Sequence, residues 1–120
     1  MKTHITTTNL DLTPSLNAYI ERKLEALSRL LTRLDEDGGV EVWLWLKRTT
    51  KHHHKGPVFK AEADVRLPGK ILRASEENFD VRAALDVVKD KLHVEIEKYK
   101  TRLRPRSVRK DKNVRTRREE

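Results

Sequence analysis

Residues 40–47 read Val-Glu-Val-Trp-Leu-Trp-Leu-Lys, and this stretch decides the fold. Every second residue from Val40 to Leu46 is aliphatic, while the residues between them are acidic, aromatic or basic. Successive side chains of a β-strand point to opposite faces of a sheet, so this alternation predicts a strand with one buried face. Such a face needs a covering layer, and we therefore expect amphipathic segments on either side of the strand.

Three further segments have strand character. Pro68-Gly69 predicts a turn between a strand at residues 58–67 and a short one at residues 70–74, and the threonine-rich residues 2–8 favour a first strand around Ile5. In the 58–67 strand, the predicted inner residues are Phe59, Ala61, Ala63, Val65 and Leu67, and the predicted outer ones are Lys60, Glu62, Asp64 and Arg66.

Two amphipathic helices are predicted around these strands. Thr13-Pro14 is a strong start signal, because the hydroxyl can cap free amides and proline lacks only an N–H that the first turn leaves unpaired. The first helix is predicted to run to about Leu34, and the second to follow a cap at Asn78 or Asp80 and to end before Pro105. Their apolar stripes, with three- and four-residue spacing, are Leu16, Tyr19, Ile20, Leu24, Leu27, Leu30, Leu31 and Leu34, and Val81, Ala84, Leu85, Val88, Leu92, Ile96, Tyr99 and Leu103.

The predicted element order is therefore β-α-β-β-β-α. This is an α+β fold, with a four-stranded mixed sheet and two amphipathic helices packed on one face. Short hairpins make the last three strands antiparallel, while a right-handed helical crossover allows the first two to be parallel. A chain of 120 residues has room for one such domain, which we place at residues 1–103.

The charge balance points to a polyanionic partner. Lys and Arg number 27 against 19 Asp and Glu, for a formal net charge of +8, and nucleic acid leads the possible partners. Residues 104–120 carry eight basic and three acidic residues, and their only aliphatic residues are Val108 and Val114. This segment is predicted to be a disordered basic tail that contacts phosphates, because it cannot offset its ordering entropy by burial.

The basic residues of the two helices fall into sectors on a helical wheel. Either these sectors follow a phosphate backbone or they are ordinary solvated faces with ion pairs at i,i+4, and the pattern alone leaves both open. The sectors are Arg22, Arg29 and Arg33 on the first helix, and Arg82, Lys89, His93 and Lys100 on one flank of the second, with Lys91, Lys98 and Arg102 on its other flank.

The segment between the strands at 40–47 and 58–67 is basic and contains three consecutive histidines. A flexible finger that donates to phosphates through Lys51, His54 and Lys55 is favoured over a plain surface loop. Adjacent histidines in a loop rarely close on one ion, and the chain has no Cys, so we expect no metal site and no cofactor.

Trp43 and Trp45 are predicted on the sheet face opposite the helices. There they could stack on RNA bases, but an RNA-recognition sheet needs aromatic residues on two neighbouring strands, and that signature is missing. We therefore expect them to pack against the aliphatic parts of Lys60, Glu62 or Arg73.

Several classes of protein are disfavoured. The sequence has no Gly-rich phosphate loop, no H-E-x-x-H and no nucleophile elbow, so an enzyme or a small-molecule substrate is not expected. The first ten residues lack the apolar stretch of a signal peptide, and the longest apolar run, Val42 to Leu46, is too short to span a membrane. These features, with the lack of Cys, predict a soluble cytoplasmic protein.

Several motifs, in this order and spacing, resemble the ribosome hibernation promoting factor family, which includes the ribosome-associated inhibitor called protein Y. The resemblance covers about residues 1–103. The motifs are Asn9-Leu10-Asp11-Leu12-Thr13-Pro14, Tyr19-Ile20-Glu21-Arg22-Lys23-Leu24, His53-His54-Lys55-Gly56-Pro57-Val58-Phe59-Lys60-Ala61-Glu62, Leu67-Pro68-Gly69-Lys70, Ala83-Ala84-Leu85-Asp86, Lys89-Asp90-Lys91-Leu92 and Lys98-Tyr99-Lys100.

The resemblance implies a domain that binds the small ribosomal subunit, in the cleft where mRNA and the A- and P-site tRNAs would lie, and that silences idle ribosomes. Long members add a C-terminal domain that pairs two ribosomes, and this chain resembles the short forms. Arg82 stands where relatives often carry Tyr, which implies a phosphate contact in place of an aromatic one. The family's basic helix positions match Arg22, Lys23, Lys89, Lys91, Lys98 and Lys100.

The complete set expected to bind rRNA joins these matched positions to the basic sectors and the loop. Two alternatives stay open: a free-standing double-stranded RNA-binding module, against which the extra first strand argues, and a basic domain that docks an acidic protein. The set is Arg22, Lys23, Arg29, Arg33, Lys51, His54, Lys55, Arg82, Lys89, Lys91, Lys98, Lys100 and Arg102.

Overall fold

The computed structural model describes residues 1–35, 38–49 and 58–103. The elements follow the predicted order β-α-β-β-β-α, and the α+β class is confirmed. The basic loop with Lys51, His54 and Lys55, and the predicted tail at 104–120, lie outside the described residues. The elements are β1 (Lys2–Thr8), α1 (Pro14–Leu31), β2 (Glu41–Arg48), β3 (Phe59–Leu67), β4 (Lys70–Asn78) and α2 (Val81–Leu103).

The four strands form one mixed sheet in the order β1-β2-β3-β4. β1 is parallel to β2, whereas β2, β3 and β4 are successively antiparallel. One row of the sheet runs from Ile5 through Leu44 and Ala63 to Ala74, and its β2, β3 and β4 members are buried. The aliphatic residues that alternate along residues 40–47 therefore lie on the inner, buried face of the sheet.

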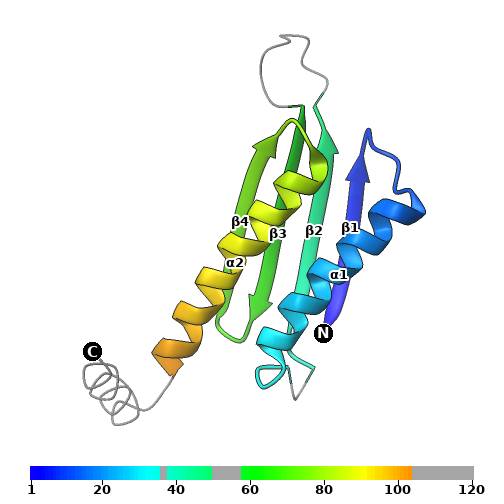
Figure 1. Cartoon of the computed structure of the whole chain (residues 1–120). Helices are drawn as coiled ribbons and strands as arrows, with labels where there is room; N and C mark the ends of the chain where they lie inside the picture. The colour runs from blue at the N-terminus through cyan, green and yellow to red at the C-terminus, as the bar shows by residue number, and fades with distance from the viewer. Residues whose placement is uncertain (36–37, 50–57, 104–120) are drawn as a thin grey trace, which may run out of the picture.

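Both helices cover this inner face. In Figure 1, α1 and α2 lie beside each other across the same side of the sheet, α1 toward β1 and β2 and α2 toward β3 and β4. α2 packs on β3 and β4 and also against α1. The helix residues buried in this layer are Leu16, Ile20, Leu24, Leu27 and Leu31 from α1, and Ala84, Leu85, Val88, Leu92, Ile96 and Tyr99 from α2.

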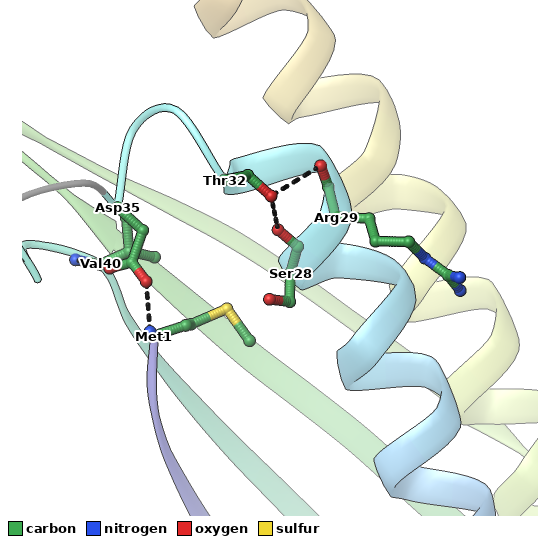
Figure 2. Close-up of polar contacts among 6 residues, drawn as sticks. All are labelled: Met1, Ser28, Arg29, Thr32, Asp35 and Val40. Carbon is green, nitrogen blue, oxygen red and sulfur yellow. Dashed lines mark hydrogen bonds and ion pairs between the residues drawn. The ribbon is translucent and has the colours of Figure 1, made fainter.

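α1 ends earlier than predicted, at Leu31 instead of about Leu34. The Thr32 hydroxyl donates to the carbonyls of Ser28 and Arg29, at 3.1 and 3.3 Å, and the chain then turns. Figure 2 shows the Asp35 carboxylate at the end of this turn, next to Met1 and Val40. One oxygen accepts from the Val40 amide at 3.2 Å, and the other contacts the Met1 amino group, which lowers the pKa of Asp35. These contacts bring the chain from α1 back to the sheet.

The connection between β4 and α2 also differs from the prediction. β4 continues four residues beyond the predicted Ala74, because Asn78 still pairs with Phe59 of β3. Asp80 caps α2: its side chain accepts from the Arg82 amide at 3.1 Å. Asn78, the other candidate cap, instead accepts from the Asp80 amide.

The outer face of the sheet carries both tryptophans, as predicted, but their partners differ. Trp43 stacks on His4 of β1, with ring centroids 3.9 Å apart, and the Arg66 guanidinium lies 4.8 Å from its ring centroid. The expected packing against Lys60, Glu62 or Arg73 is thus wrong for Trp43, because β1 is parallel to β2 and places His4 directly opposite it. Trp45 does line a hollow with those three residues.

The last turns of α2 are tied to the sheet by a buried tyrosine. Tyr99 is 9% exposed, and its hydroxyl donates to the Pro68 carbonyl, at the turn between β3 and β4, over 3.1 Å. Tyr99 and Pro68 are 31 residues apart in the sequence, and their hydrogen bond joins the C-terminal turns of α2 to the β3–β4 turn.

We expect Tyr99→Phe to lower the free energy of unfolding by about 1 kcal/mol, because the ring stays buried while one hydrogen bond is lost. In a domain of this size, that loss lowers the melting temperature by about 4–8 °C. Thr101→Val is the control, since the Thr101 hydroxyl is exposed and bonds only within its own helix. Equal melting temperatures for Tyr99→Phe and the unmodified chain would show that the bond adds nothing to stability.

Candidate nucleic-acid interface

A carboxylate joins the two helices across the groove between them. Asp86 of α2 accepts a hydrogen bond of 2.6 Å from the Tyr19 hydroxyl of α1, and the Lys23 ammonium lies 3.0 Å from the same oxygen. Tyr19 and Asp86 are 67 residues apart in sequence, so helix packing alone brings them together. We call Tyr19, Lys23 and Asp86 the interhelical clasp.

The clasp shifts the titration of all three groups. The hydrogen bond to Asp86, together with burial, raises the pKa of Tyr19. The bond to Asp86 also raises the pKa of Lys23, against the effect of its burial. For Asp86, burial acts to raise the pKa, but the bonds from Tyr19 and Lys23 outweigh it and hold the pKa below its ordinary value. The clasp therefore stays an ion pair with a neutral phenol at neutral pH.

Three cations surround the ring of Tyr19. The Arg22 guanidinium lies 5.5 Å from the ring centroid, the Lys23 ammonium 5.1 Å, and the Arg82 guanidinium 5.4 Å. Cations at these distances are attracted by the negative face of an aromatic ring. Arg82 belongs to α2 and also donates to the Ser15 hydroxyl of α1 over 2.7 Å. One aromatic side chain thus gathers positive charge from both helices at one place.

Lys89 extends this basic surface along α2. Its side chain is 23% exposed, its ammonium lies 3.7 Å from Asp90, and its charge helps to lower the pKa of Asp86. Together with the residues around the ring it forms what we call the groove cluster. Its members are Tyr19, Arg22, Lys23, Arg82, Asp86 and Lys89, four cations with one carboxylate.

The remaining basic residues of α1 lie farther along the chain. Arg29 is exposed in the last turn of α1, and in Figure 2 its side chain points to the side of the helix away from Asp35. Arg33 was placed on the helix by the sequence, but it lies in the turn that follows, because α1 ends at Leu31. Its place in the predicted helical sector is therefore wrong.

The other flank of α2 does not join the groove cluster. The Lys91 ammonium donates to the Ser75 carbonyl at 2.9 Å and pairs with Glu76 at 3.3 Å, so it ties α2 to β4. Lys98 and Arg102 line a shallow surface with the exposed Val94. Lys100, which was predicted on the same flank as Arg82 and Lys89, has a side chain that is 28% exposed and lies 3.9 Å from Glu97. Of the basic residues predicted on α2, only Arg82 and Lys89 thus belong to the groove cluster.

Tyr19 and Asp86, the two residues that organise the groove cluster, are not among the predicted site residues. The sequence pattern places Tyr19 on the apolar stripe of the first helix and gives Asp86 no role beyond its place in the motif Ala83-Ala84-Leu85-Asp86. The spacing of Tyr19 to Arg22 and Lys23, three and four residues, was a usable signal, because residues so spaced are neighbours on a helix. Nothing local links Tyr19 to Asp86.

The groove cluster has the chemistry of a phosphate site. Arginine presents several donors in a fixed plane that matches the oxygens of a phosphate, and lysine adds a point charge. Because the clasp and the ring hold the cations in place, less side-chain freedom remains to be lost on binding. Within residues 1–35, 38–49 and 58–103, no three metal-ligating side chains converge, and no helix is long and apolar enough to cross a membrane.

Comparison with known proteins gives a consistent result. A family model described as Sigma 54 modulation protein / S30EA ribosomal protein matches residues 3–104. A ribosome hibernation promotion factor of Deinococcus radiodurans is 30% identical over 94 residues, which cover 78% of this chain and 46% of that protein. The factor of the same name from Lactococcus lactis is 31% identical over 112 residues, covering 90% of this chain and 55% of the relative. The chain thus spans about half the length of these relatives.

Solved structures share the fold. The N-terminal domain of Thermus thermophilus protein Y superposes with a TM-score of 0.64 at 29% identity, covering 82% of this chain and 99% of that one. A ribosomal subunit interface protein from Coxiella burnetii has the same fold, with a TM-score of 0.63 at 22% identity over 84% of this chain and 99% of that one. Because the family model matches almost all of the described domain, the chain belongs to the Sigma 54 modulation protein / S30EA ribosomal protein family, the hibernation factor family that its motifs resemble.

Proposed function

We propose that this protein is a ribosome hibernation factor that binds the small ribosomal subunit in the cleft for mRNA and the A- and P-site tRNAs. It would contact rRNA through the groove cluster and act as a steric block, without catalysis. The tail at 104–120 would add phosphate contacts.

The observation that carries the proposal is the convergence of Arg22, Lys23 and Arg82 on one ring. These cations come from both helices, and only Lys23 among them has a carboxylate partner among the described residues. Surface charge that serves only solubility needs no such convergence. Cations held at one point by packing favour a phosphate backbone, which fixes the register of a protein on RNA.

The relatives support the same assignment. Two of them are named ribosome hibernation promotion factor, at 30% and 31% identity. The first alternative, a double-stranded RNA-binding module, begins with a helix and has a three-stranded sheet. The parallel strand β1 at the edge of this sheet favours the hibernation factor instead.

We expect Arg22→Gln with Arg82→Gln to weaken binding to purified small subunits, with each lost phosphate contact costing about 1–3 kcal/mol. Co-sedimentation at fixed salt measures this. The matched control is Lys2→Gln with Lys70→Gln, which removes the same charge from exposed positions of the strands. If both double variants lose affinity equally, binding depends on net charge and the groove cluster is not the interface.

The salt dependence of subunit binding should reveal the phosphate contacts. An interface engaging on the order of six phosphates gives a log–log slope of about −4 to −5 against salt concentration. We expect the Arg22, Arg82 double variant to flatten this slope by about 1–2, because each phosphate-bound cation contributes about one unit. A slope unchanged by the double substitution would contradict the proposed contacts.

The clasp should contribute to stability in a pH-dependent way. Asp86→Asn removes the charge that pairs with Lys23, and we expect a loss of about 0.5–1 kcal/mol at neutral pH. Because the folded pKa of Asp86 is lowered, its stabilisation is full above the unfolded pKa and is lost as the pH falls through the folded pKa. Thermal melts from neutral to acidic pH should show the two proteins converging in acid. Asp90→Asn, at an exposed site, is the control, and a gap that persists in acid would contradict the ion-pair assignment.

A further inference from the structure

The two tryptophans on the outer face of the sheet have different neighbours. Trp43 is enclosed between the His4 ring, at 3.9 Å and nearly parallel, and the Arg66 guanidinium, at 4.8 Å. His4 is itself held by Glu41 over 3.0 Å. Trp45 is half-buried and lies 6.3 Å from Trp43, with the two rings 19° from parallel, and within the described part of the chain no further ring and no cation lies over it. The part of the Trp45 ring that Trp43 does not cover therefore has no stacking partner among the described residues.

This surface lines a hollow of about 440 Å³ on the outer face. Asp64 and Arg73 form one wall and satisfy each other: the carboxylate is buried and lies 3.3 Å from the guanidinium. Glu62 lies directly across from Trp45 in the β2–β3 pair, is half-buried, and has no ion pair among the described residues. The hollow thus places a carboxyl group beside the uncovered part of the Trp45 ring.

The next row along the strands carries two cations. Lys47 and Lys60 are directly opposite each other in the β2–β3 pair, and both line the hollow. Like charges in this position destabilise a sheet unless an anion lies between them. Glu77 is opposite Lys60 on the other side, but the two form no ion pair within 4 Å in the described structure. The pair of lysines therefore fits an anionic group of a ligand.

We propose that this hollow binds a guanine nucleotide, with the base stacked on Trp45, its edge on Glu62 and its phosphate between Lys47 and Lys60. A carboxylate only accepts hydrogen bonds, and guanine is the base whose pairing edge offers two adjacent donors to it, the ring N–H and the amino group. The two rows are about 7 Å apart, as residues i and i+2 of a strand are, and a nucleotide spans that distance between base and phosphate.

This site is independent of the proposed subunit interface. The groove cluster lies on the helices, whereas the residues that line the hollow all belong to strands of the sheet. Either free guanosine monophosphate or a guanosine within single-stranded RNA could bind this site, because the base of each can stack on an aromatic side chain. Titrations with each ligand distinguish the two sources.

Intrinsic fluorescence tests the proposal directly, because the chain has only two tryptophans and both are on this face. Trp43→Phe leaves Trp45 as the reporter, and we expect guanosine monophosphate, or a uridine oligonucleotide with one guanosine, to quench it. Trp45→Phe should lose most of this response, and Trp45→Leu should weaken binding about ten- to a hundredfold by removing the stacking surface. Quenching by the oligonucleotide alone identifies RNA as the source, and quenching by both identifies the nucleotide itself.

Glu62→Gln tests the recognition of the base edge. Guanosine monophosphate should bind the Trp43→Phe protein about tenfold more tightly than adenosine monophosphate. With glutamine at position 62 the preference should shift toward adenine, because an amide offers one donor and one acceptor to match adenine. Arg22→Gln with Arg82→Gln should leave the nucleotide response unchanged. Equal binding of the two nucleotides to the Trp43→Phe protein, or no quenching by any guanine ligand, would overturn the proposal.

Discussion

The aliphatic face of β2 has to be buried, and in this chain the two helices bury it by lying side by side on one face of the sheet. Leu44 and Leu46 are almost fully buried, as are Ile20 of α1 and Ile96 of α2 in the same layer. Because the apolar stripes of two helices lying side by side cover the four-stranded sheet, the polar flanks of the helices meet along the groove between them. The position of the basic residues in space therefore follows from hydrophobic burial, not from attraction between the charged groups.

Within that groove, the Asp86 carboxylate reduces the repulsion between the neighbouring cations. Arg22, Lys23 and Arg82 would repel one another around Tyr19 if no anion were present. Asp86 offsets part of this repulsion, and it also fixes the phenol that the cations surround. The groove keeps a positive excess because two carboxylates, Asp86 and Asp90, face four cations when Lys89 is counted. An anion such as a phosphate group can then bind without first displacing a full set of internal ion pairs.

The two sides of the domain offer different chemistry. The helical side presents cations gathered around one phenol, which suits a charged backbone more than a particular base. The outer side of the sheet presents an indole ring, a carboxylate and a pair of lysines, which suits a planar base with a phosphate. Parallel pairing of β1 with β2 contributes to this difference, because it sets His4 on Trp43 and leaves Trp45 to line the hollow.

The sequence by itself determined the element order, the mixed sheet, the inner faces of β2 and β3, and the helix sectors that carry charge, with the exception of Arg33. Each depends on a period of two or 3.6 residues, and that period is set by the geometry of near neighbours. The ends of α1 and β4 were predicted less accurately. The Asp35 carboxylate, which ends the turn after α1, and Asn78, at the end of β4, both bond to partners elsewhere in the chain. Only the tertiary structure decided that Tyr19 contacts Asp86, that Lys91 ties α2 to β4, and that His4 and Arg66 lie over Trp43 while Trp45 lines the hollow. These contacts join groups that are far apart in the sequence, so they depend on how two helices and four strands are placed against one another, and no local pattern of residues encodes that placement.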